Sequence, residues 1–131
     1  AGMGYGSHVD APYMDGVRTD LSFTLFLSPP DAYEGGELVL EGLGAEDLVK
    51  LPAGALVLYP STSVHRVETV RSGRRLVAVG WIKSRVRSAE ARAAIFELEQ
   101  ATSALRSTAA PVEILDRLQN VHNNLLRLFG E

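Results

Sequence analysis

Two residues near the start of the chain, His8 and Asp10, have the side chains and the spacing of a pair of metal ligands. In an extended backbone, residues i and i+2 point to the same side, so both side chains can reach one ion. Pro12 favours extended or turn geometry in the residues just before it. A His-x-Asp pair is common by itself, however, and the alternative is two polar side chains in a solvated loop.

His65 adds a third potential ligand, early in a predicted strand that follows the loop PSTSV. Two histidines and one carboxylate match the facial arrangement that holds iron(II) at non-haem sites and leaves three coordination positions open. The chain has no cysteine, which excludes thiolate ligands, disulfides and cysteine nucleophiles, so any metal must be held by His and carboxylate. The alternative for His65 is a hydrogen-bonded histidine at the end of a strand.

Arg75, ten residues after His65, is the next residue with a potential chemical role. A strand and a turn separate the two residues, so they can approach each other on neighbouring antiparallel strands. An inward-pointing Arg75 would lie among apolar side chains, where a cation needs an anionic partner. A small carboxylate bound through two hydrogen bonds would satisfy it. The alternatives are a salt bridge within the protein and an exposed position at the mouth of a barrel.

The orientation of Arg75 also predicts the orientation of its neighbours. Because side chains alternate along a strand, Arg74 is expected to face the other way, into solvent. The residues that would share the inward face, as a dry wall of the site, are Val77, Val79 and Trp81, and Tyr5 is expected at its mouth.

Residues 1–84 are predicted to form a β domain. Short strands separated by turns rich in Gly and Pro are typical of a sandwich or a barrel. Ser22, Thr24 and Phe26 would share one face of an alternating strand; hydroxyls on an inner face would indicate a ligand site, whereas the alternative is a sheet edge facing water. The seven predicted strands are residues 5–8, 21–27, 37–40, 48–51, 55–59, 64–70 and 76–83, with a turn at 71–73.

Residues 85–131 are predicted to form a helical hairpin, because apolar residues follow helical spacing in two segments. Ser88 is expected to cap the first helix, Pro111 to lie in the first turn of the second, and Gly130 to end it. We expect the hairpin to pack on the β domain or at a subunit interface, which would give a homodimer. His122 is expected to form a hydrogen bond between helices or at that interface rather than to bind metal.

The composition limits the classes of partner. The 131 residues are enough for one domain of ordinary size, and 46% apolar with 22% charged residues is typical of a globular chain. A net charge of −3 without any basic run gives no indication of a nucleic-acid or membrane partner. We find neither a membrane-spanning stretch nor a signal-peptide pattern, and expect a cytoplasmic location. Because the chain opens with Ala1 rather than Met, we expect its natural start to lie upstream.

The order His-x-Asp, Gly-Gly-Glu-Leu, His and Arg resembles that of the bacterial PKHD-type hydroxylases, in the prolyl/lysyl 4-hydroxylase branch of the Fe(II)/2-oxoglutarate-dependent dioxygenases. The resemblance covers essentially the whole chain. It implies a mainly β fold, a double-stranded β-helix (jelly roll) followed by the helical hairpin. Family members are generally longer, and their upstream region, with the first core strand and packing helices, would be absent. The segments that carry the resemblance are YGSHVDAP, VRTDLSFTLFLSPPDAYEGGELVLEG, VKLPAGALVLYPSTSVHRVETVRSGRRLVAVGWIKS and VHNNLLRLFGE.

The resemblance also implies the site and the reaction. His8, Asp10 and His65 would hold Fe(II), and Arg75 would bind the distal carboxylate of the cosubstrate 2-oxoglutarate. With O2 as the other cosubstrate, an unidentified small-molecule or peptide substrate would be hydroxylated, and succinate and CO2 would be released. Ascorbate could serve as a reductant.

One contact departs from the family pattern. Some relatives in the wider branch place a Tyr hydroxyl where the strand corresponding to residues 21–27 approaches 2-oxoglutarate, whereas this strand has Phe26 and no Tyr. Thr24 or Tyr59 could supply that second contact.

Two other functions fit the same residues. A catalytically silent metal-binding or interaction module could use the helical hairpin as its docking surface, although an intact triad with Arg75 argues against a loss of activity. A cupin-like isomerase or hydrolase with another divalent metal would need no anion clamp, and so would leave Arg75 without a role.

Overall fold

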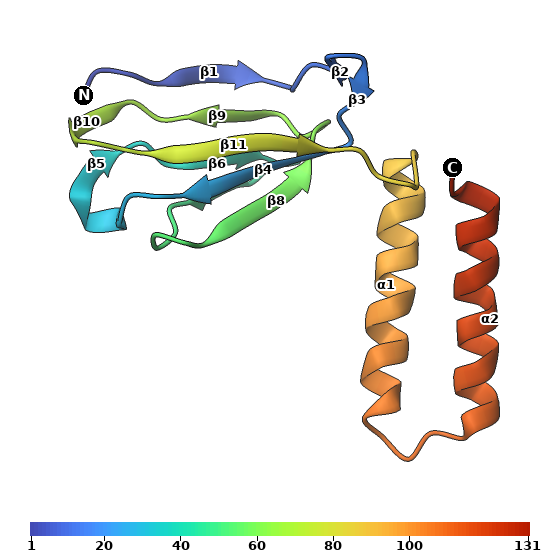
Figure 1. Ribbon diagram of the computed structural model, residues 1–131. Coiled ribbons are helices and arrows are strands. Elements are labelled where there is room, and N and C mark those ends of the chain that lie inside the picture. The colour runs from blue at the N-terminus through green and yellow to red at the C-terminus, as the bar shows by residue number, and fades with distance from the viewer. The chain divides into compact units, whose positions relative to one another are not determined.

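The computed structural model describes residues 1–131, which form two compact units, Ala1–Lys83 and Ser84–Glu131 (Figure 1). The first unit is built of strands and the second of two helices. The predicted β core followed by a helical hairpin is confirmed.

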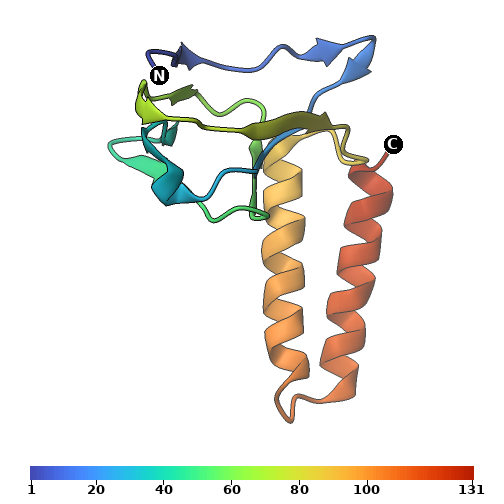
Figure 2. The same cartoon turned by 60° about the vertical axis from the view of Figure 1, so that its left-hand side comes forward.

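Two larger antiparallel sheets make up most of the first unit (Figures 1 and 2). Residues of both sheets line a cavity. The first sheet has the strand order β1-β9-β6-β7 and the second has the order β11-β4-β8. The strands of the first sheet are β1 (Tyr5–His8), β9 (His65–Val67), β6 (Leu38–Glu41) and β7 (Glu46–Val49). Those of the second are β11 (Val77–Ile82), β4 (Leu21–Phe26) and β8 (Leu56–Pro60). Sequence neighbours are thus often in different sheets, as a jelly roll requires.

Four short strands and one 3₁₀ turn complete the unit, and the sequence did not predict them. The strand β5 (Tyr33–Gly35), after η1 (Pro30–Ala32), pairs with β10 (Val70–Gly73), and β2 (Tyr13–Met14) pairs with β3 (Val17–Arg18). The predicted strand 64–70 is therefore wrong, because β9 ends at Val67 and β10 pairs in a different sheet. The predicted turn 71–73 is part of β10, and the predicted strand 48–51 begins and ends two residues earlier, as β7.

The strand β4 shows why a cavity exists. Its three even-numbered residues, Ser22, Thr24 and Phe26, are buried, and its odd-numbered residues are half-buried. Phe23, on the outer face, lies over Gly80 of β11, where a Cβ atom would come within 2.5 Å of the ring. On the inner face Phe26 is the one large side chain, and the two small hydroxyl residues, Ser22 and Thr24, leave space between the sheets.

The second unit is an antiparallel pair of helices, α1 (Ala89–Arg106) and α2 (Val112–Phe129). The Ser88 side chain accepts a hydrogen bond from the Ala91 backbone N–H at 3.0 Å, which confirms the predicted cap. Gly130 ends α2, as predicted, whereas Pro111 stands one residue before the helix rather than in its first turn. A small apolar cluster holds the ends of the hairpin together and consists of Val86, Ala91, Ile95 and Leu125. Neither helix combines the length and the apolar character that crossing a bilayer requires.

Candidate metal centre

His8 and His65 lie side by side because their strands pair. His8 is the last residue of β1 and His65 the first of β9, and the antiparallel register of these strands places their Cα atoms opposite each other. The centroids of the two rings are 4.3 Å apart. Asp10 follows β1 by two residues, and its backbone N–H donates to the carbonyl of Ser61 at 3.3 Å, which holds Asp10 beside the segment that follows β8.

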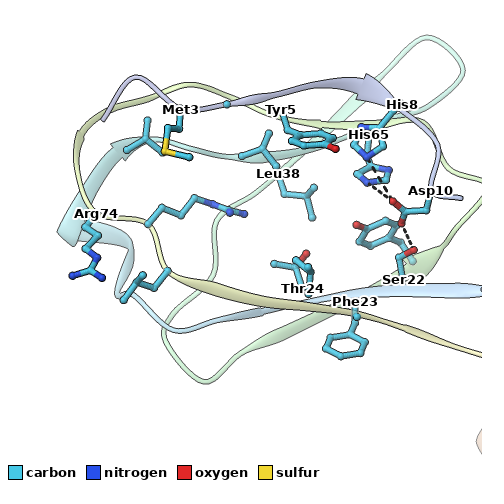
Figure 3. A pocket seen from close by; sticks show the side chains of 18 of the residues that line it. Met3, Tyr5, His8, Asp10, Ser22, Phe23, Thr24, Leu38, His65 and Arg74 are labelled. Carbon is cyan, nitrogen blue, oxygen red and sulfur yellow. Dashed lines mark hydrogen bonds and ion pairs between the residues drawn. The ribbon is translucent and has the colours of Figure 1, made fainter. Parts of the chain in front are cut away.

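Hydrogen bonds to the backbone orient both imidazoles. The Nδ1 atom of His8 lies 2.7 Å from the Gly6 carbonyl, and that of His65 lies 3.0 Å from the Ser63 carbonyl. A carbonyl only accepts, so each Nδ1 carries the proton and each Nε2 of a neutral ring presents a lone pair. These Nε2 atoms lie 3.6 Å (His8) and 3.7 Å (His65) from Oδ1 of Asp10. Two nitrogen lone pairs and a carboxylate oxygen therefore converge on one point (Figure 3).

The cavity that these residues line has a volume of about 590 Å³ and is bounded by both sheets. Its walls are mostly apolar, and Leu38, Val79 and Trp81 are among them. Trp81 and Val79 thus lie where the sequence predicted, and Tyr5, 65% exposed, lies at the mouth. Val77 does not line the cavity, although it belongs to the same strand.

Arg75 lines the same cavity, so of the orientations that the sequence left open the structure has the inward one. Its side chain is half-buried, its Nε atom is buried without a hydrogen-bond partner, and burial lowers the pKa of the guanidinium. Tyr33 lies beside it, and its hydroxyl is likewise buried without a hydrogen bond of normal geometry; burial raises the pKa of that hydroxyl, while the charge of Arg75 and a side-chain interaction with Arg75 lower it. A cation with an unused donor in such a place is suited to an anionic ligand. Arg74 is exposed and extends away from the cavity from its rim (Figure 3).

Gly36 makes room for Arg75. Its φ is +68°, in the left-handed region that favours glycine. A Cβ atom there would come within 2.9 Å of Cδ of Arg75 and 3.2 Å of the Tyr33 ring. The Gly-Gly-Glu-Leu motif therefore has a structural reason, because its second glycine lets the arginine side chain pass.

Thr24 and Tyr59, the two predicted alternatives for a second contact, both line the cavity from neighbouring strands. Tyr59 packs edge-on against His65, with ring centroids 5.0 Å apart. Burial, and next the charge of Asp10, raise the pKa of the Tyr59 hydroxyl, while an interaction with Thr24 lowers it. Figure 3 shows the Thr24 side chain pointing into the cavity, between Asp10 and Arg74.

Residues 1–83 match the family model described as the 2OG-Fe(II) oxygenase superfamily. The chain belongs to this superfamily. The family name implies iron(II) and 2-oxoglutarate as the groups that such proteins use, with O2 as cosubstrate.

Curated relatives confirm the resemblance to the PKHD-type hydroxylases. The chain is 54% identical over 132 residues to a PKHD-type hydroxylase of Parvibaculum lavamentivorans and 49% identical over 130 residues to one of Picosynechococcus sp.. Each comparison covers 99% of this chain and 59% of the relative, so the chain spans about three-fifths of the length of these relatives.

Two solved structures are also similar to this chain. A Pseudomonas putida prolyl-4-hydroxylase has 32% identity and a TM-score of 0.52, over 64% of this chain and 46% of that chain. A 2OG-Fe(II) oxygenase family oxidoreductase from Burkholderia pseudomallei has 26% identity and a TM-score of 0.50, over 59% and 36% of the two chains.

The residues present fit the metal that the oxygenase family name implies. Distances of 3.6 and 3.7 Å are too long for hydrogen bonds between Asp10 and the two histidines, so these three residues do not satisfy one another. Imidazole nitrogens and a carboxylate oxygen are suitable ligands for iron(II). The second ring nitrogen of each histidine is already bound to a carbonyl, which is the usual outer contact of a metal-ligating histidine.

The sequence pointed to the main residues of the cluster but not to those behind them. His8, Asp10, His65 and Arg75 all come to one cavity, whereas His122 lies in the other unit, 3.8 Å from Glu99 across the hairpin. Three residues that contact the cluster or Arg75 escaped prediction. They are Ser61, next to Ser22 and Asp10; Tyr33, next to Arg75; and Gly36, which admits Arg75. Of these three residues only Gly36 had a signal in the sequence, because it belongs to the Gly-Gly-Glu-Leu motif of the family.

Proposed function

We propose that this protein is an Fe(II)/2-oxoglutarate-dependent dioxygenase that hydroxylates an organic substrate, a small molecule or a peptide side chain. One observation carries the proposal: the converging His8, Asp10 and His65 share a cavity with Arg75, a half-buried cation whose Nε has no partner in the protein. A metal site alone would fit many functions. A metal site with an anion site in the same cavity fits a cosubstrate that has a chelating end and a distal carboxylate.

The residues have separate tasks in this proposal. His8, Asp10 and His65 would hold the metal by three ligands and leave its other positions to the cosubstrate and O2. Arg75 would bind the distal carboxylate of 2-oxoglutarate through charge-assisted hydrogen bonds. Thr24 or Tyr59 would give the second polar contact, and Val79 and Trp81, which are 60% and 39% exposed, would form part of the apolar wall. Iron(II), when bound, would supply the activation of O2 that couples decarboxylation of 2-oxoglutarate to oxidation of a C–H bond.

The overall reaction balances with the cosubstrates named. One atom of O2 enters the succinate formed from 2-oxoglutarate, CO2 leaves, and the other oxygen atom becomes the hydroxyl of the product. We propose ascorbate only as an external reductant of the iron, and the cytoplasm as the place of action.

The proposal predicts a spectroscopic signal and a product. Anaerobic addition of Fe(II) and 2-oxoglutarate to the purified protein is expected to give a weak visible charge-transfer band, which should be absent with either addition alone. Exposure to O2 and ascorbate should then release succinate. If the protein binds the metal but gives neither the band nor succinate, it is the silent module instead. An absorption that appears with the metal alone and that 2-oxoglutarate does not change would favour another metal-dependent reaction.

We also propose that the exposed apolar side of α2 joins two copies of the chain. Ile114, Val121 and Leu128 recur every seven residues and are 48%, 49% and 72% exposed. Two helices cannot bury such a row by themselves, and a row with heptad spacing fits the same row of a second copy.

Light scattering on a sizing column tests this contact. Val121→Glu is expected to convert a dimer into a monomer, because it places a charge within the apolar row. Asn120→Glu, a change at the neighbouring exposed polar residue, should leave the dimer intact. A protein that is monomeric before any substitution would contradict the proposal.

A further inference from the structure

We propose that Ser22 and Ser61 form a buried hydroxyl relay that positions Asp10 to offer a single oxygen to a metal ion. Both are positioning residues, since they act through the Asp10 carboxylate. The inference rests on the proposed metal site and adds to it how the Asp10 carboxylate is held. A carboxylate that binds through one oxygen occupies one coordination position and leaves the others open to further ligands.

The two oxygens of Asp10 have different surroundings. Oδ1 faces the Nε2 atoms of His8 and His65, at 3.6 and 3.7 Å. Oδ2 accepts a hydrogen bond from the Ser22 hydroxyl (Figure 3). One oxygen is therefore directed at the point where the ligands converge, while the other is held by the protein.

The direction of the relay follows from its proton count. An ionised carboxylate only accepts hydrogen bonds, so Ser22 uses its single proton on Asp10. The Ser22 and Ser61 Oγ atoms are 2.8 Å apart, and Ser61 must therefore be the donor in that bond. The order is Ser61 to Ser22 to Asp10.

Burial and backbone contacts make the relay rigid. Ser22 and Ser61 are 2% and 4% exposed, so water does not compete for these hydrogen bonds. The backbone N–H of Ser61 donates to the Asp20 carbonyl at 3.1 Å, and the Ser61 carbonyl accepts from Asp10 at 3.3 Å. The segment after β8 thus holds Asp10 in two ways, through its backbone and through the hydroxyl pair.

Loss of the Ser22 hydroxyl would release Oδ2. The terminal torsion of Asp has broad minima, so an unheld carboxylate can rotate and present both oxygens to a metal. A second oxygen would occupy a position that the cosubstrate needs, and the fixed orientation of Oδ1 would be lost. Removing such an outer contact typically lowers metal affinity by about 10–100-fold.

Cobalt(II) binding to the metal-free protein tests the relay without turnover. Ser22→Ala is expected to bind cobalt about 10–100-fold more weakly than the unchanged protein and to shift its ligand-field absorption, which reports the coordination. Ser61→Ala should change the cobalt affinity and the absorption in the same direction but by less, because Ser22 can still donate to Asp10. Ser28→Ala is the matched control: Ser28 is also buried with two hydrogen bonds, at 2.9 Å to Arg74 and Leu76, and its loss should alter neither readout.

The outcomes separate this inference from the proposed function. No cobalt binding by the unchanged protein would contradict the metal site itself. Tight binding with the same affinity and spectrum in Ser22→Ala would overturn the relay alone. Circular dichroism checks that each variant is folded, so that weaker cobalt binding reports the missing hydroxyl and not a loss of structure.

Discussion

Replacing His65 by alanine is expected to lower the affinity of the protein for iron(II) or cobalt(II) by more than about 100-fold. Loss of a residue that only contacts a metal ligand already lowers the affinity by about 10–100-fold, and loss of the ligand itself should cost more. His65 supplies one of three ligand atoms that lie within 4.8 Å of one another, and its ring is held by the Ser63 carbonyl and packed against Tyr59. With two ligands left, neither the charge-transfer band with 2-oxoglutarate nor succinate release should remain.

Calorimetric titration with cobalt(II) measures this loss, and His122→Ala is its control. His122 is also a partly buried histidine, but it contacts Glu99 within the helical hairpin. His122→Ala should therefore bind metal as the unchanged protein does. Equal affinities for the His65→Ala and His122→Ala variants would refute the assignment of His65 as a ligand.

The second large effect is expected at the other end of the cavity. Arg75→Ala should weaken 2-oxoglutarate binding by about 100- to 4,000-fold, since breaking a buried ion pair costs about 3–5 kcal/mol and 1.4 kcal/mol corresponds to a factor of ten. Arg75→Lys keeps the charge but not the two-donor fork, so we expect a smaller loss. Metal affinity in the absence of 2-oxoglutarate should not change in either variant, because Arg75 is not one of the three ligands.

Titration of the charge-transfer band with 2-oxoglutarate measures this difference. Arg74→Ala is the natural control, because Arg74 carries the same charge, is next in sequence and also borders the cavity, but its side chain is exposed to solvent. If Arg74→Ala weakened 2-oxoglutarate binding as much as Arg75→Ala, general electrostatic attraction and not a specific clamp would explain the effect. An unchanged affinity in Arg75→Ala would eliminate the clamp.

The candidate ligands were predictable from sequence because their signal is chemical and local. A His-x-Asp pair puts two ligands on one side of an extended segment whatever the rest of the fold. Parity along one strand likewise predicted that Ser22 and Thr24 share the inner face with Phe26, and burial bears this out. The same alternation predicted that Val77 shares the wall of the site with Val79 and Trp81, but Val77 does not line the cavity.

The strand boundaries were harder, because local pattern does not show which strand is the partner. Residues 64–73 read as one strand and a turn, yet β9 pairs with β1 and β6, and β10 pairs with β5. Gly35 and Gly73, both with positive φ, approach the backbones of these partners so closely that a Cβ atom would lie within 2.2 and 2.1 Å of a carbonyl oxygen. Such close approaches depend on strands that are far apart in the chain.

The sequence by itself thus determined the family, the β core with its helical hairpin, and the identity of the three candidate ligands and the arginine, because residue type, order and spacing suffice for these. Only the tertiary structure decided how those side chains are held. The direction of each imidazole, the two different oxygens of Asp10 and the partnerless Nε of Arg75 beside Tyr33 follow from contacts between distant segments. The register between such segments is set by the packing of the whole β unit, and no short stretch of sequence contains it.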